Sequence, residues 1–183
     1  MVAGGVSGAL ILTLAMDDAS FTWFDDLRRR HFPPERNVVP AHLTLFHNLS
    51  GEELEAVRVE LRAVCAETPA FDMAVAGPWS LGRGVAYRLA SPEAAALRGR
   101  LAAAFGPWLK PQDRQGWRPH VTVQNKAEPA EAKALLAELQ HGFEPFEVQA
   151  EGLLLWRYLG GPWEAMDRLP FAAPRSASTA SSP

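Results

Sequence analysis

Apolar and polar positions along the chain follow two periods, and the changes between them separate strands from helices. The run over 8–14, which is apolar except for Thr13, is typical of a strand buried on both faces. Phe21, Phe24 and Leu27 follow at helical spacing, which predicts a helix that is capped by Asp18 or Ser20 and ends near residue 31, before a Pro-Pro pair. The chain therefore opens with a buried strand and an amphipathic helix.

The rest of the first half continues with the same two periods. A short apolar strand is expected at 41–46, and 71–76 is expected to form another strand that ends at Gly77-Pro78. Between them, Ser50 and Glu53 have the spacing of a capping box, which predicts a helix over 52–66.

The second half repeats this order. Ser91 before Pro92 is typical of a helix start, with Pro at the first helical position. The expected elements are a strand at 84–89, a helix from 92 to about 108, a loop at 110–118, a strand at 119–124, a helix from 129 to about 140, a long strand at 146–156 and a last strand near 163–169. Repetition predicts a duplicated, bilobal α+β domain over 1–171, with pseudo-repeats at about 8–77 and 84–171. The Ala- and Ser-rich tail 172–183 is predicted to be disordered.

One three-residue motif occurs at the same place in both halves. His42-Leu43-Thr44 and His120-Val121-Thr122 each lie in a predicted strand, 34 and 36 residues after the first strand of their half begins. Side chains two residues apart on a strand point to the same face, so each His shares a face with its Thr. Two such strands side by side would bring two imidazoles and two hydroxyls together.

That group suits acid–base chemistry on a phosphodiester. Histidine can give or take a proton near neutral pH, because its unperturbed pKa is about 6.5. Hydroxyl donors from Thr44 and Thr122 would stabilise charge on the phosphoryl oxygens. We find no Gly-rich nucleotide loop and no metal-ligand spacing, the nearest being His42-x4-His47, so no cofactor and no metal are expected. The pseudo-symmetry leaves open which histidine is the acid and which the base.

Composition and charge limit the partners. With 48% hydrophobic and 21% charged residues the chain is an ordinary globular one. A net charge of −3 favours a small or terminal phosphate ligand over a long polyanion, although the Arg28-Arg29-Arg30 run keeps RNA contact open.

Cys65 is the only cysteine, which excludes an internal disulfide, and it is expected to be packed and inert. Because 1–14 has no signal or membrane-span pattern, we expect a cytoplasmic protein without membrane contact, and nothing indicates an obligate protein partner.

Several other residues have two readings. Arg157 is either a phosphate ligand beside the cleft or a solvated hairpin residue. His47 would face away from His42 in a regular strand, and it is expected to be a structural or rim residue. The aromatic residues that could stack on a base or simply pack in the core are Phe46, Tyr87, Trp117 and Tyr158.

The two motifs, 78 residues apart in matching halves, resemble the two-histidine (2H) phosphoesterase superfamily, most of all its bacterial 2′-5′ RNA ligase or RNA 2′,3′-cyclic phosphodiesterase branch. The resemblance extends over about 6–171. It includes the run Leu153 to Tyr158 and the following Gly-Gly-Pro-Trp-Glu, which are similar to the C-terminal hairpin of that group.

The resemblance implies two antiparallel sheets flanking a central cleft, with helices outside and no metal. It implies that His42 and His120 are the catalytic pair and that Thr44 and Thr122 bind the substrate phosphate. The expected activity is opening of a 2′,3′-cyclic phosphate on a small cyclic nucleotide or an RNA end, with reverse 2′-5′ ligation by the same groups. The alternative is a non-catalytic module that holds a nucleotide or RNA end in the same cleft.

Overall fold

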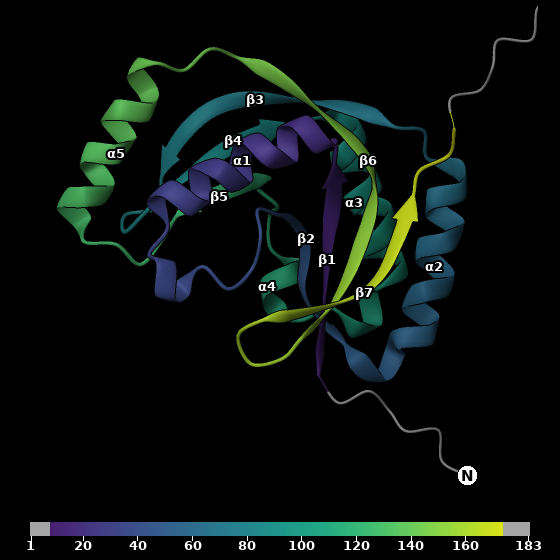
Figure 1. Cartoon of the computed structure of the whole chain (residues 1–183). Coiled ribbons are helices and arrows are strands. Elements are labelled where there is room, and N and C mark those ends of the chain that lie inside the picture. The colour runs from purple at the N-terminus through teal and green to yellow at the C-terminus, as the bar shows by residue number, and fades with distance from the viewer. Residues whose placement is uncertain (1–7, 174–183) are drawn as a thin grey trace, which may run out of the picture.

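A computed structural model describes residues 8–173, which form one α+β unit (Figure 1). The first half contains β1 (Ala9–Met16), α1 (Asp18–His31), β2 (Leu43–Ser50), α2 (Leu54–Glu67) and β3 (Phe71–Ser80). The second half contains β4 (Val85–Ala90), α3 (Pro92–Ala104), α4 (Pro111–Arg114), β5 (His120–Gln124), α5 (Pro129–His141) and β6 (Phe146–Tyr158), followed by β7 (Trp163–Pro170). Apart from the short α4 and the additional strand β7, the two halves have the same order of elements.

The strands form one antiparallel sheet that closes on itself. Their order is β1-β2-β5-β4-β3-β6-β7, and β1 also pairs with β6. The long strand β6 is shared, since 146–150 pair with β3 and 152–158 pair with β7. At the opposite side the two lobes meet where β2 pairs with β5 through Leu43 and Val121. The α+β fold class with helices outside is confirmed, and the two expected sheets are joined into a ring.

Each half contributes its first helix to the strands of the other half. Helix α1 packs on β5 and β4, where Trp23 and Phe24 contact Tyr87 with ring centroids 5.2 and 5.7 Å apart. Helix α3 packs on β2, where Phe105 meets Phe46 at 5.5 Å. Helices α5 and α2 complete the two outer layers (Figure 1). The other face of the central strands is turned away from these helices.

Local chemistry explains where several elements begin and end. Asp17, not Asp18 or Ser20, caps α1, because its carboxylate accepts from the Ser20 backbone N–H at 2.9 Å. Ser91 caps α3 as predicted. The predicted end of β3 at Gly77-Pro78 is wrong: Gly77 adopts φ 122° at a bulge, and pairing with β4 continues to Ser80.

Two further details differ from the sequence-based elements. Ser50 caps a single 3₁₀ turn before α2 by accepting from the Glu52 N–H at 3.3 Å, and the helix itself begins at Leu54. The segment expected to be a loop at 110–118 contains α4, which begins with a proline at its first position.

Backbone hydrogen bonds hold the C-terminal end of the described chain against the fold. The Ala172 N–H donates to the Cys65 and Thr68 carbonyls at 3.0 and 2.8 Å, so the segment predicted as a tail is anchored at its first residue, while 174–183 lie outside the described residues. Cys65 itself is 4% exposed, and burial raises the pKa of its thiol to about 11, as expected for a packed, unreactive cysteine. No helix within 8–173 is both long and apolar enough to cross a membrane.

Candidate active site

The two His-x-Thr motifs lie on adjacent strands. Leu43 of β2 pairs with Val121 of β5 in antiparallel register. Extending this register by one residue in each direction sets His42 opposite Thr122 and Thr44 opposite His120. Leu43 and Val121 are fully buried toward the helices, so the motif side chains point to the opposite, helix-free face. Both imidazoles and both hydroxyls therefore share one small patch of sheet.

Both imidazoles are held in the same way. Nδ1 of His42 lies 2.7 Å from the carbonyl oxygen of Pro40, and Nδ1 of His120 lies 2.8 Å from that of Arg118. A carbonyl oxygen can only accept, so each Nδ1 carries a proton, and Nε2 is the ring nitrogen that remains to exchange a proton with a ligand. In both motifs the bond runs to the residue two positions earlier, which is a local result of the extended backbone before each strand.

The surroundings of His42 keep its ring neutral. Burial lowers the pKa of His42 to about 4, against an opposing contribution from the Pro40 hydrogen bond. Repulsion from Arg28 and from the two nearby imidazoles, His120 and His47, contributes a smaller part of this lowering. At neutral pH His42 is thus a free base.

Buried polar groups of α1 fix the segment that carries His42. The Asp25 carboxylate accepts from the Ala41 backbone N–H at 2.8 Å. The Arg28 guanidinium donates to the Asn37 side chain and the Val39 carbonyl, at 2.8 and 3.0 Å. Arg28 is only 3% exposed, so the first arginine of the Arg28-Arg29-Arg30 run is a structural residue and not part of a surface patch.

Two cavities flank the motif side chains. One, of about 440 Å³, is lined by His42 together with largely apolar residues such as Phe21, Trp156 and Met166. We call it the apolar cavity. The other, of about 450 Å³, is lined by Thr44 and His120 together with mostly polar residues, and we call it the polar cavity. A ligand reaching both histidines would extend from one cavity toward the other.

Aromatic residues that the sequence did not single out stand beside each histidine. The Trp163 ring lies 4.5 Å from the His42 ring, and Trp79 lies edge-on to His120 at 6.1 Å. Arg88 pairs with His120 across the β4–β5 ladder and stacks its guanidinium 4.4 Å over Trp79. Trp163 belongs to the Gly-Gly-Pro-Trp-Glu hairpin, so its motif was visible, but its position beside His42 depends on β6–β7 pairing.

Of the four aromatic residues that the sequence offered for stacking on a base, Trp117 belongs to this site. Its Nε1 donates to the Thr44 carbonyl at 2.9 Å, and the ring lines the polar cavity. Phe46 and Tyr87 are core residues at 0% and 2% exposure, whereas Tyr158 is exposed.

Arg157 is not brought to the histidines. It pairs with the core residue Leu10 on β1, whereas Thr13, on the same face as Thr44, pairs with Leu154. Arg157 and Leu154 are three residues apart and thus on opposite faces of β6. Its guanidinium instead forms an ion pair with Glu164 at 3.0 Å, and its Nε is buried without a hydrogen-bond partner, so this half-buried side chain fits neither the phosphate-ligand reading nor the solvated-hairpin reading.

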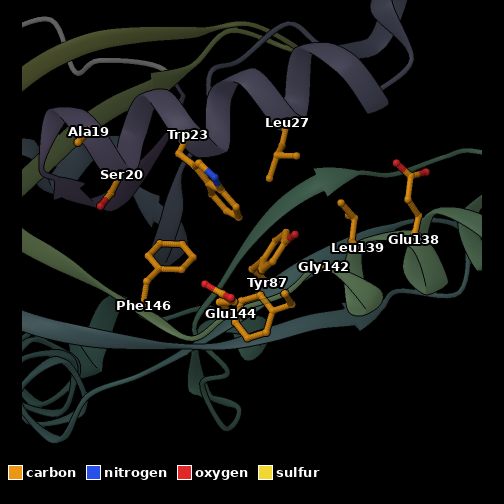
Figure 2. A pocket seen from close by; sticks show the side chains of 11 residues that line it. Ala19, Ser20, Trp23, Leu27, Tyr87, Glu138, Leu139, Gly142, Glu144 and Phe146 are labelled. Carbon is orange, nitrogen blue, oxygen red and sulfur yellow. The ribbon is translucent and has the colours of Figure 1, made fainter.

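A third cavity, of about 530 Å³, lies apart from the motifs. It opens between α1 and the α5–β6 segment, where Trp23 points toward Tyr87 and Phe146 (Figure 2). Neither His-x-Thr motif lines it. Within 8–173, no three His, Cys, Asp or Glu side chains are grouped as a metal site would need.

A family model for the 2′-5′ RNA ligase superfamily matches residues 16–162, a range that includes both motifs. The chain belongs to this superfamily of 2H phosphoesterases. The resemblance derived from the two motifs is thereby confirmed.

Solved structures of this 2′-5′ RNA ligase superfamily have the same fold. TT0787 of Thermus thermophilus is similar with a TM-score of 0.66 at 17% identity, over 90% of this chain and 98% of that chain. Escherichia coli LigT, in a complex with 3′-AMP, has a TM-score of 0.59 at 18% identity with the same coverage. LigT has also been solved with NADP+, again at a TM-score of 0.59, with 17% identity and the same coverage. No curated protein sequence matches the chain.

Proposed function

We propose that this protein is a metal-independent phosphodiesterase that opens a 2′,3′-cyclic phosphate by two-histidine acid–base catalysis. The observation that carries the proposal is the register of β2 on β5, in which each motif histidine faces the other motif's threonine. Membership of a phosphoesterase superfamily supports the reaction class. The complex of LigT with 3′-AMP supports a ribonucleotide as ligand, by analogy of fold only.

His42 is the proposed base. Because its pKa is about 4, Nε2 is free at neutral pH to take a proton from water. The water oxygen then forms a bond to phosphorus while the bond from phosphorus to one ribose oxygen breaks. His120, on the other side of the phosphate, acts as an imidazolium: its Nδ1–H stays on the Arg118 carbonyl while its Nε2 proton passes to that departing oxygen, and the product is a phosphate monoester with a free hydroxyl.

Thr44 and Thr122 are the proposed phosphate ligands. Their hydroxyls lie on the face of the two imidazoles, where they can donate to the phosphoryl oxygens as charge builds up. 2′-5′ ligation would use the same groups with an RNA 5′-hydroxyl in place of water: His42 would deprotonate that hydroxyl, its oxygen would bond to phosphorus, and the 3′ oxygen would leave with the proton from His120, which gives a 2′-5′ linkage. The attacking group that is supplied decides between hydrolysis and ligation.

The test is turnover of 2′,3′-cyclic AMP, CMP, GMP and UMP, and of oligoribonucleotides with a 2′,3′-cyclic end, followed by chromatography. We expect a monoester product from the wild-type protein and none from the double variant that carries both His42→Ala and His120→Ala. If the wild-type protein binds these compounds but releases no product, the site is a binding module and the catalytic proposal is wrong.

A further inference from the structure

A third histidine is turned into the polar cavity by an irregularity in β2. Between the pairs Thr13–Thr44 and Leu10–Leu49, β1 advances three residues while β2 advances five. The extra residues form bulges, and Leu45 and Phe46 are both fully buried, so two successive side chains point to the core. His47 consequently returns to the face of Thr44, contrary to the alternation of a regular strand, and it lines the polar cavity. Bulges often re-aim a side chain beside an active site.

A buried carboxylate fixes His47 in this position. Asp113 of α4 is 1% exposed, and its Oδ1 accepts from the His47 backbone N–H at 2.9 Å and lies 3.2 Å from the imidazole Nδ1. Its Oδ2 accepts from the Asn48 N–H at 2.9 Å. Burial raises the pKa of Asp113, but these hydrogen bonds outweigh it, and the pKa lies below its usual value. The ionised Asp113 carboxylate accepts a hydrogen bond from Nδ1–H of His47, so Nε2 is the imidazole nitrogen that can contact a ligand in the polar cavity.

The polar cavity has the composition of an anion site. Asp113 is the only carboxylate among the residues that line it, and its oxygens already accept from His47 and Asn48. The charged or titratable groups that line the polar cavity with His47 are Asp113 from α4, Arg98 from α3, His120 from β5 and Arg118 before β5, and His42 is close enough to interact with His47 electrostatically. The Arg98 guanidinium already donates hydrogen bonds to the backbone carbonyls of Leu45 and Asp113, at 3.1 and 2.7 Å. Arg118 is exposed and belongs to the same wall.

The position of His47 fits a second phosphate on the same ligand. It follows Thr44 by three residues, so at roughly 3.3 Å per residue the two Cα atoms are separated by at most about 10 Å. The 3′ and 5′ phosphates of one nucleotide are joined by six bonds and lie closer together than this upper limit, and the side chains and the phosphoryl oxygens extend into the remaining distance. A phosphoryl group held by Thr44 and His120 would thus leave the 5′ phosphate of the same nucleotide near His47 and Arg118.

We propose that His47, oriented by Asp113, forms with Arg118 a subsite for a second phosphate, so that the site favours nucleotides that carry a 5′-phosphoryl group in addition to the one at the histidines. An imidazolium has two N–H donors, one for the Asp113 carboxylate and one for the anion. This inference rests on the proposed function for the place of the first phosphate. Asp113 is a positioning residue, since it acts through His47.

Calorimetric titration with adenosine 3′-phosphate and adenosine 3′,5′-bisphosphate tests the subsite. We expect the wild-type protein to bind the bisphosphate about 10-fold more tightly, and this ratio to fall to near 1 in His47→Gln and to fall clearly in Arg118→Gln. His141→Gln changes an exposed histidine on α5 and is the matched control, with the wild-type ratio. Asp113→Asn should lower the ratio, whereas a purely structural Asp113 would weaken both ligands equally.

The outcomes separate this subsite from the proposed reaction. Equal affinity of the wild-type protein for the two ligands, or an unchanged ratio in His47→Gln, would overturn the subsite even if cyclic phosphates are hydrolysed. Conversely, a preference for the bisphosphate that is lost in His47→Gln, in a protein that hydrolyses no cyclic phosphate, would retain the subsite and refute only the catalysis.

Discussion

The Arg28 guanidinium lies 2.9 Å from the carbonyl oxygen of Thr122, so a helix of the first half is bonded directly to the motif strand of the second half. The same side chain binds the Val39 carbonyl just before His42. Burial lowers the pKa of Arg28 to about 10, which still leaves it charged at neutral pH. One cation thereby sets the spacing of the two motifs.

Replacing Arg28 by Met should reduce the free energy of unfolding by on the order of 3 kcal/mol, because the carbonyls of Val39 and Thr122 lose a charged donor in a buried place. Urea denaturation measures the change. Arg30→Met is the control, since Arg30 is exposed, and it should shift the free energy by less than about 0.5 kcal/mol. Equal effects of the two substitutions would mean that Arg28 does not join the motifs.

The contrast between the buried Arg28 and the exposed Arg30 is an example of what the sequence alone does not predict. Periodicity located the strands and helices, and the repeated His-x-Thr context identified the face that carries both motifs. It did not show which arginine of the run is buried, because that depends on α1 crossing to the other half. Trp79, Trp163 and Arg88 were missed because strand pairing brings them to the histidines: the β4–β5 pairing for Arg88, and the place of the β3–β4 and β6–β7 pairs in the closed sheet for the two tryptophans.

Local irregularities were the second source of error. A bulge adds residues without a clear sequence signal, and the bulges in β2 reverse the expected direction of His47. For Arg157 the difference lies in which face of the strand its side chain occupies. The strand was predicted correctly, but its register on β1 puts the Arg157 side chain on the core face. A one-residue change of phase exchanges the two faces of a strand.

His42→Ala and His120→Ala should each reduce kcat for a 2′,3′-cyclic nucleotide by at least about 10²-fold, because each removes one proton transfer. The double variant should lose far less than the product of the two, since the residues act as a unit. Steady-state turnover measures this, with His141→Gln as the control. Near-wild-type activity in either single variant would refute the two-histidine mechanism.

Thr44→Val and Thr122→Val should cost less, on the order of 10-fold in kcat each. Each removes one neutral hydroxyl donor worth about 1 kcal/mol but keeps a β-branched side chain on the strand. The measurement is turnover together with thermal unfolding. A loss as large as that of the histidine variants, in a fully folded protein, would assign the threonines a larger part than phosphate binding.

Activity should survive extensive dialysis against EDTA, because the proposed reaction needs only proton transfers and hydroxyl donors. Turnover before and after chelation, and after adding back Mg²⁺, Mn²⁺ or Zn²⁺, measures this. Complete loss that one divalent ion restores would mean that the imidazoles bind a metal in place of exchanging protons.

The low pKa of His42 predicts a specific pH dependence of stability. In the folded protein the pKa is about 4, whereas in the unfolded chain it is near 6.5, so between these values the unfolded state binds more protons. Stability from this group is therefore complete above about pH 6.5, declines as the pH falls toward 4, and does not change further below that. The whole loss is at most about 3.4 kcal/mol, at about 1.36 kcal/mol for each pKa unit between the two values.

The measurement is the free energy of unfolding in urea at steps from pH 7.5 to 4, for the wild-type protein and for His42→Gln, which keeps a polar side chain that does not titrate. The difference between the two proteins isolates His42 from the carboxylates and from the other histidines. We expect the wild-type protein to lose more stability than the variant across this window. Parallel curves would show that His42 is as readily protonated in the fold as in the unfolded chain, and His42 would then no longer be favoured as the base over His120.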